Sequence, residues 1–209
     1  MDPIPVGDHT VAMPEWGGSS DLPRLLARLL AVAHPLMGAG ACSVALVEPG
    51  RVLRFVAASG TGATQILGQS IPTDRGVAGW AVTTGQAISV GDVETDARFA
   101  RDFAESTGYL PRHITAVPIT RDEATIGVVE VLDGDHALLS SASGSAGLHA
   151  LVAAAADLVG SFAGTSTASP VHRAAVDALA RLDDADPELA AQLSAVVQAL
   201  AGGRGVRRR

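Results

Sequence analysis

Two pairs of apolar, β-branched segments, each joined by a tight connection, place the strongest constraint on the fold of this chain. The first pair spans 43–48 and 52–58 around a Pro-Gly turn, and the second spans 114–120 and 125–132. Connections this short allow only antiparallel pairing of the segments that they join. The sequence therefore predicts two β-hairpins and a sheet with antiparallel neighbours.

Helical patterns flank these hairpins. The segment 22–36 follows Asp21, a suitable N-cap, and the segment 148–162 repeats apolar residues at helical spacing. Between the hairpins, a helix is expected from Gly76, then a short edge strand, then a second helical segment around 97–105. This order predicts an α+β domain built around one central antiparallel sheet.

Composition divides the rest of the chain. The first twenty residues contain three Pro and three Gly, which predicts a flexible leader at 1–20. We assign 21–163 to the sheet domain, 164–170 to a linker, 171–201 to a helical extension and 202–209 to a disordered Arg-rich tail.

Charge and hydropathy limit the location and partners of the protein. The formal net charge is −7, and all fifteen basic residues are Arg. An acidic balance disfavours nucleic acid as a partner, because that binding needs many cationic contacts to phosphates. No secretory signal pattern begins the chain. The longest apolar runs, near 22–37 and 148–162, contain charged residues or His and fall short of the roughly 20 residues that cross a bilayer. We therefore expect a cytoplasmic protein with no membrane insertion.

Three motifs then occur in a fixed order. They are Gly-Val-Ala-Gly-Trp-Ala-Val at 76–82, Asp-Val through Arg-Phe at 92–99, and Val-Pro-Ile followed by Ile-Gly-Val-Val-Glu-Val within 117–131. Together they resemble the GAF domain, a sensory fold related to PAS domains, over about residues 22–162. The resemblance implies that the first and last helices cover one face of the sheet and that helical insertions roof the other. Members of this family bind cyclic nucleotides, bilins, haem or other small molecules, so the fold alone does not decide the function.

The side chains that these ligands require are largely missing. The Asn-Lys…Phe…Asp-Glu signature that usually accompanies cyclic-nucleotide binding in the family is impossible in a chain with neither Lys nor Asn. Cys42, the single cysteine, is predicted on a core strand. Bilin attachment in the family needs an accessible cysteine in the roofing insertions, so the position of Cys42 disfavours it. A single cysteine also cannot complete the thiol–disulfide cycle by which some members reduce methionine sulfoxide. His113 is a candidate haem ligand, but a histidine at the end of a loop is the simpler interpretation. We expect no cofactor, no metal site and no enzymatic activity.

Aromatic residues gather where the roof is expected. Four of the seven in the chain fall within thirty positions, and such side chains either line a ligand pocket or only pin the insertions onto the sheet. The start of the helix at Gly76 offers backbone amides to an anionic ligand. Arg75 and Arg112 can add charged hydrogen bonds. The candidate pocket residues are Arg75, Gly76, Trp80, Phe99, Phe103, Tyr109, Arg112 and His113.

The two flanking helices are apolar over more than one face. In the family such helices often pair across a two-fold axis, so the resemblance implies a homodimer. The candidate interface residues are Leu25, Leu29, Val32, Leu36, Leu151 and Leu158.

These observations lead to one expectation and one alternative. We expect a non-enzymatic bacterial sensory or regulatory protein, in which an unidentified small molecule in the cavity shifts the roof and the helices, which contact a separate output protein. The alternative is a ligand-free dimerisation or interaction scaffold whose side chains fill the cavity. An open cavity near Trp80 and Phe103 would favour the first.

Overall fold

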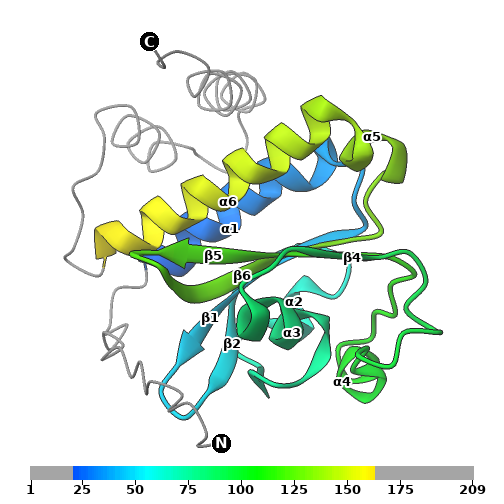
Figure 1. Ribbon diagram of the computed structural model, residues 1–209, viewed down its shortest axis with the longest axis horizontal. Coiled ribbons are helices and arrows are strands. Elements are labelled where there is room, and N and C mark those ends of the chain that lie inside the picture. Colours follow the sequence, from blue (N-terminus) through cyan, green and yellow to red (C-terminus); the bar gives the residue numbers. More distant parts are fainter. Residues whose placement is uncertain (1–20, 163–209) are drawn as a thin grey trace, which may run out of the picture.

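The computed structural model describes residues 21–162, which form a six-stranded antiparallel sheet with helices on both faces (Figure 1). The strand order is β3-β2-β1-β6-β5-β4. The strands are β1 (Ala41–Glu48), β2 (Val52–Gly60), β3 (Ser70–Pro72), β4 (Ile88–Val90), β5 (Ile114–Arg121) and β6 (Ala124–Leu132). Both predicted hairpins are confirmed, and their strands β1 and β6 pair at the centre of the sheet.

Two long helices lie side by side on one face of the sheet (Figure 1). They are α1 (Asp21–Leu36) and α6 (Ala142–Phe162), with the short α5 (His136–Ser140) just before α6. The opposite face, called here the roof side, carries α2 (Ala63–Ile66), α3 (Gly76–Thr84) and α4 (Arg101–Ser106). The α+β class and the arrangement expected from the sequence are confirmed.

The direction of the side chains alternates along the central strands, which produces two separate cores, one on each face of the sheet. Successive side chains of a strand point to opposite faces. On β6, Val129 and Val131 therefore pack beneath α1 and α6, whereas Val128 and Leu132 contact the roof-side core. The roof-side core also holds Phe55. The same alternation decides which strand residues reach the site described below.

The core beneath the two long helices contains most of the residues that were expected to contact a partner. Four of the six are buried within the chain: Leu25, Leu29, Leu151 and Leu158. Because each helix turns these side chains toward the sheet, they are not available to a second protein, and the expectation for them is wrong. Val32 is half-buried against the same core, and Leu36 remains 51% exposed.

The last helix of the sheet domain is longer than the sequence pattern predicts. It begins at Ala142, so it contains 21 residues, and the mean hydropathy of its most apolar stretch is 1.4. By length and composition it can cross a bilayer, contrary to the expectation that no apolar segment is long enough. In this fold the helix packs on α1 and β5 instead, with 39% of that stretch buried.

The remaining predicted segments lie outside the described residues. These are the leader at 1–20, the linker at 164–170, the helical extension at 171–201 and the Arg-rich tail at 202–209.

Candidate functional site

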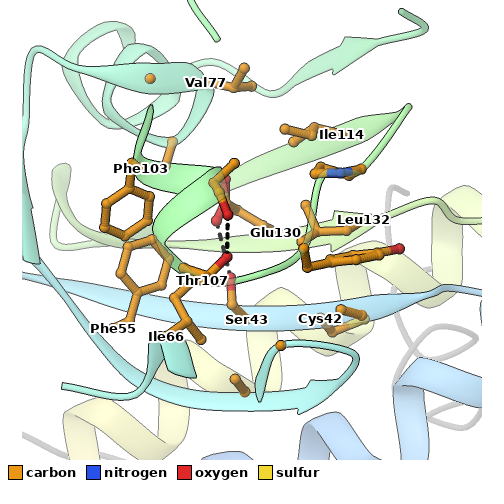
Figure 2. A pocket seen from close by; sticks show the side chains of 18 of the residues that line it. Cys42, Ser43, Phe55, Ile66, Val77, Phe103, Thr107, Ile114, Glu130 and Leu132 are labelled. Atoms are coloured by element: carbon orange, nitrogen blue, oxygen red, sulfur yellow. Dashed lines mark hydrogen bonds between the residues drawn. The ribbon is translucent and has the colours of Figure 1, made fainter. Parts of the chain in front are cut away.

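A cavity lies between the roof side of the sheet and the segments that cover it (Figure 2). It holds about 660 Å³ of space between atoms, counted out to its open mouth, of which about 70 Å³ admits the centre of a water molecule. This space is small, so the cavity suits a small molecule. Its walls come from β1, β2, β6, the three roof-side helices and the loop before β5.

A buried carboxyl group stands at the floor of the cavity (Figure 2). Glu130, on β6, is only 7% exposed and is the cross-strand neighbour of Ser43 on β1. The Ser43 hydroxyl donates a hydrogen bond to Glu130 Oε2 at 3.0 Å. Burial raises the pKa of Glu130 to about 7, and the bond from Ser43 opposes that rise. At neutral pH this group can therefore both hold and release a proton.

Positive charge is absent from the cavity walls within the described residues. The ionisable side chains among the lining residues are Glu130, Tyr109 and Cys42. Cys42 also packs in the core beneath α1 and α6, and burial raises its pKa to about 12. Burial, together with the neighbouring Asp133, raises the pKa of Tyr109 as well. Glu130 is therefore the one lining group that changes charge near neutral pH.

Aromatic rings form one wall of the cavity. Phe55 from β2 and Phe103 from α4 stack with ring centroids 5.4 Å apart and an interplanar angle of 23°. In the view of Figure 2 these rings lie on one side of Glu130, with Ile114 and Leu132 on the other. The cavity thus has one polar corner in mostly apolar surroundings, an arrangement typical of small-molecule sites.

Tyr109 fastens the loop between α4 and β5 beside the cavity. Its hydroxyl donates to Asp133 Oδ2 at 2.5 Å, and Asp133 Oδ1 accepts bonds from the backbone amides of Arg112 and His113 at 2.7 and 2.9 Å. The tyrosine lies so close to Gly40 that a Cβ atom there would be 2.1 Å from the hydroxyl oxygen. Gly40 and Asp133 therefore hold this wall in place.

The predicted pocket residues divide into two groups. Four line the cavity, namely Gly76, Phe99, Phe103 and Tyr109. Four do not, namely Arg75, Trp80, Arg112 and His113.

Surface interactions explain why the second group lies outside. The Arg75 guanidinium pairs with Asp102 on α4, and the Arg98 guanidinium lies 5.2 Å from the centroid of the Trp80 ring. Arg112 and His113 are exposed. The expectation of an anion held in the cavity by Arg75 and Arg112 is therefore wrong, because neither cationic group reaches it.

Sequence reasoning missed the two residues at the floor. A signal for Glu130 was present, since it is the only charged residue in the apolar segment 126–132, and charged residues are rarely buried without a role. No comparable signal existed for Ser43. Its place beside Glu130 depends on the register between β1 and β6, which are far apart in the sequence. Among residues 21–162, no group of three or more His, Cys, Asp or Glu side chains is arranged to hold a metal ion.

Sequence comparisons identify related proteins. The family model of the GAF domain matches residues 19–165. A stretch of 58 residues is 34% identical to the cone cGMP-specific 3′,5′-cyclic phosphodiesterase subunit alpha′ of Mus musculus. That match spans 28% of this chain but only 7% of the phosphodiesterase subunit, so it concerns a small part of a much longer protein.

Solved structures share the architecture. The GAF domain of an Acinetobacter phosphoenolpyruvate-protein phosphotransferase has a TM-score of 0.57 and 17% identity, covering 74% of this chain and 91% of that one. The type II free methionine-R-sulfoxide reductase from Thermoplasma acidophilum has a TM-score of 0.52 and 19% identity, covering 68% and 97%. At these identities the similarity shows the fold alone. Since the second protein is an enzyme, the fold by itself does not separate catalysis from regulation.

Proposed function

The chain belongs to the GAF domain family, and we propose that it is a non-enzymatic regulatory protein that binds a small molecule in the cavity above Glu130. GAF domains in general regulate or bind ligands. The observation that carries the proposal is the carboxyl group of Glu130, 7% exposed on the floor of an open, mostly apolar cavity. Burying such a group lowers stability unless a partner compensates it. Groups of this kind concentrate at functional sites.

The chemistry of the lining residues supports binding rather than thiol catalysis. The chain contains one cysteine, and the pKa of Cys42, raised to about 12, keeps it protonated. A protonated, buried thiol is a poor nucleophile. A reductive thiol cycle also needs a second thiol to resolve the intermediate.

The sheet provides a physical route from the cavity to the long helices. Ser43 and Glu130 stand on β1 and β6, and the alternate residues of those strands, such as Val44 and Val129, pack beneath α1 and α6. A ligand that shifts the cavity floor therefore biases the helices on the other face. We propose that α1 and α6 then act on a second copy of the chain or on a separate output protein in the cytoplasm.

The second candidate function is a ligand-free interaction scaffold. The surface of α6 favours it, because 39% of its most apolar stretch is buried among the described residues and Leu36 of the adjacent α1 is 51% exposed. The open cavity favours ligand binding instead. The two functions therefore differ in whether the cavity is occupied in the working protein.

Native mass spectrometry of the full chain, freshly purified from cells, tests this difference. Ala58→Leu adds a larger side chain to the cavity wall, and Ala137→Leu makes the same change at an exposed position of α5. We expect a retained small molecule in the wild type and in Ala137→Leu, and none in Ala58→Leu. We expect a dimer in all three. A wild type that carries no small molecule and is not stabilised by any member of a metabolite library would refute ligand binding and leave the scaffold.

A further inference from the structure

The charge of the cavity restricts what it can bind. Among the lining residues of the described chain, Glu130 supplies the only charge near neutral pH, because Tyr109 and Cys42 keep their protons. The arginines of the roof segments do not line the cavity. Arg75 pairs with Asp102, Arg98 with Asp96 and Arg101 with Glu94, and Arg112 lies outside. Within the described residues, no cationic group compensates the Glu130 carboxylate, and a cationic ligand can supply this charge.

The space beside Glu130 is left open by small side chains. Its cross-strand neighbour on β1 is Ser43, and the next residue in this row is Ala58 on β2; both line the cavity. Glu130 Oε2 accepts the bond from Ser43, while Oε1 accepts none from the described residues. The Ser43 oxygen also keeps lone pairs that can accept a hydrogen bond. Two acceptors thus face the same open space.

The remaining walls fit the body of a small cation. Phe55 and Phe103 present stacked rings, and aromatic faces attract a nearby positive charge. Ile66 and Leu132 add aliphatic surface. The space that the centre of a water molecule can reach amounts to only about 70 Å³, so the body must be small.

We propose that the cavity selects a small organic cation, an ammonium group on a short apolar body, over neutral and anionic molecules of the same size. The ammonium donates hydrogen bonds to Glu130 Oε1 and Ser43 Oγ, and the body lies between the aromatic and aliphatic walls. This selectivity rests on the ligand-binding function proposed above. An ammonium replaces the solvation that Glu130 loses on burial, whereas an anion is repelled by the same carboxylate.

Three probes of matched chain length test the selectivity on the full chain: n-butylammonium, 1-butanol and butyrate. Each is titrated into ¹⁵N-labelled protein, freed of retained ligand, at a pH above 7. We expect n-butylammonium to shift the amide signals of β1 and β6 around Ser43 and Glu130, with an affinity at least about tenfold above that of 1-butanol. Butyrate should leave these signals unchanged.

Variants connect the binding to the carboxylate. Glu130→Gln keeps the shape of the side chain but removes its charge, and should lower the affinity for n-butylammonium by about tenfold or more while leaving 1-butanol unaffected. Glu105→Gln removes an exposed carboxylate on α4 and should change neither. Ser43→Ala keeps the carboxylate and loses one acceptor, and should weaken n-butylammonium binding. This variant therefore tests the proposal even if Glu130→Gln folds poorly.

Proton release gives a readout that a merely structural glutamate would not produce. At about pH 6, one unit below its raised pKa, the Glu130 carboxyl is largely protonated, so binding of an ammonium must drive nearly one proton off it. Isothermal titration calorimetry in two buffers with different ionisation enthalpies counts this proton. We expect close to one released per bound n-butylammonium in the wild type and none in Glu130→Gln.

The outcomes separate this selectivity from the ligand-binding function itself. Equal affinity for 1-butanol and n-butylammonium, or unchanged n-butylammonium binding in Glu130→Gln, would overturn the selectivity and leave a cavity that still binds ligands. Failure of all three probes would also overturn it. The retained molecule sought by native mass spectrometry then decides the proposed function independently.

Discussion

Replacing Glu130 by Gln should abolish a pH dependence of stability that the buried carboxyl group creates. Burial raises the pKa of Glu130 from an ordinary 4.5 to about 7 in the folded chain. Between these values the unfolded chain has released the proton and the folded chain still holds it. The free energy of unfolding therefore falls as the pH rises through this window. At ~1.4 kcal/mol for each pH unit between the two values, ionisation of Glu130 lowers the free energy of unfolding by about 3 kcal/mol.

Urea unfolding followed by circular dichroism, at several pH values from 4.5 to above 7, measures this effect on ligand-free protein. The wild type should lose about 3 kcal/mol more stability across this range than Glu130→Gln does. The control Glu105→Gln should follow the wild type. Because the same other groups titrate in all three proteins, their contributions cancel in the differences. Asp96, whose pKa Arg98 lowers to about 2, is one such group, and it acts with the opposite sign at lower pH.

Parallel stability curves for the wild type and Glu130→Gln across the window would refute the reasoning. They would mean that Glu130 is solvated or already compensated in the folded chain. The cation selectivity proposed for the cavity would then lose its physical basis, because no uncompensated carboxylate would remain for a ligand to neutralise.

Three further expectations concern the packing around the site. Gly40→Ala places a methyl group against the Tyr109 hydroxyl, and should lower the free energy of unfolding by ~1–3 kcal/mol and speed amide hydrogen exchange in the loop that carries this tyrosine. Gly79→Ala brings a methyl carbon to 2.8 Å from a backbone carbonyl oxygen before α3, and urea unfolding should show a loss of similar size. The control Gly91→Ala meets nothing within 4 Å and should stay within about 0.5 kcal/mol of the wild type, so an equal loss in all three variants would contradict the packing argument. Cys42, with 1% exposure and a pKa of about 12, should resist a thiol-specific reagent in the folded protein and react on unfolding, and rapid labelling of the folded form would contradict its burial.

Local patterns account for the parts of the fold that could be predicted. The two hairpins depend on turns of a few residues, and the helix periodicity of α1 and α6 repeats within each segment. Interactions between neighbours along the chain produce such features, so they are visible in the sequence. The aromatic residues of the roof were also predicted as candidates, and Phe99, Phe103 and Tyr109 line the cavity.

The polar residues that line the cavity, and the arginines that do not, could not be predicted in the same way. Arg75 lies immediately before the motif at 76–82, which suggests an anion site, yet its guanidinium turns outward to Asp102, which lies 27 residues further on. Ser43 meets Glu130 across a separation of 87 residues. Such pairings depend on strand register and helix orientation, which no local pattern encodes.

The sequence by itself determined the α+β class, the two hairpins, the GAF resemblance and the absence of the residues that several known cofactors need. Only the tertiary structure decided which side of the sheet each side chain faces. It therefore decided that the carboxyl group of Glu130, and neither Arg75 nor Arg112, lines the cavity. It also decided that Leu25, Leu29, Leu151 and Leu158 serve the core of one chain. Hairpins and helices arise from contacts between near neighbours, whereas the charge of a cavity is the sum of groups that only long-range pairing brings together.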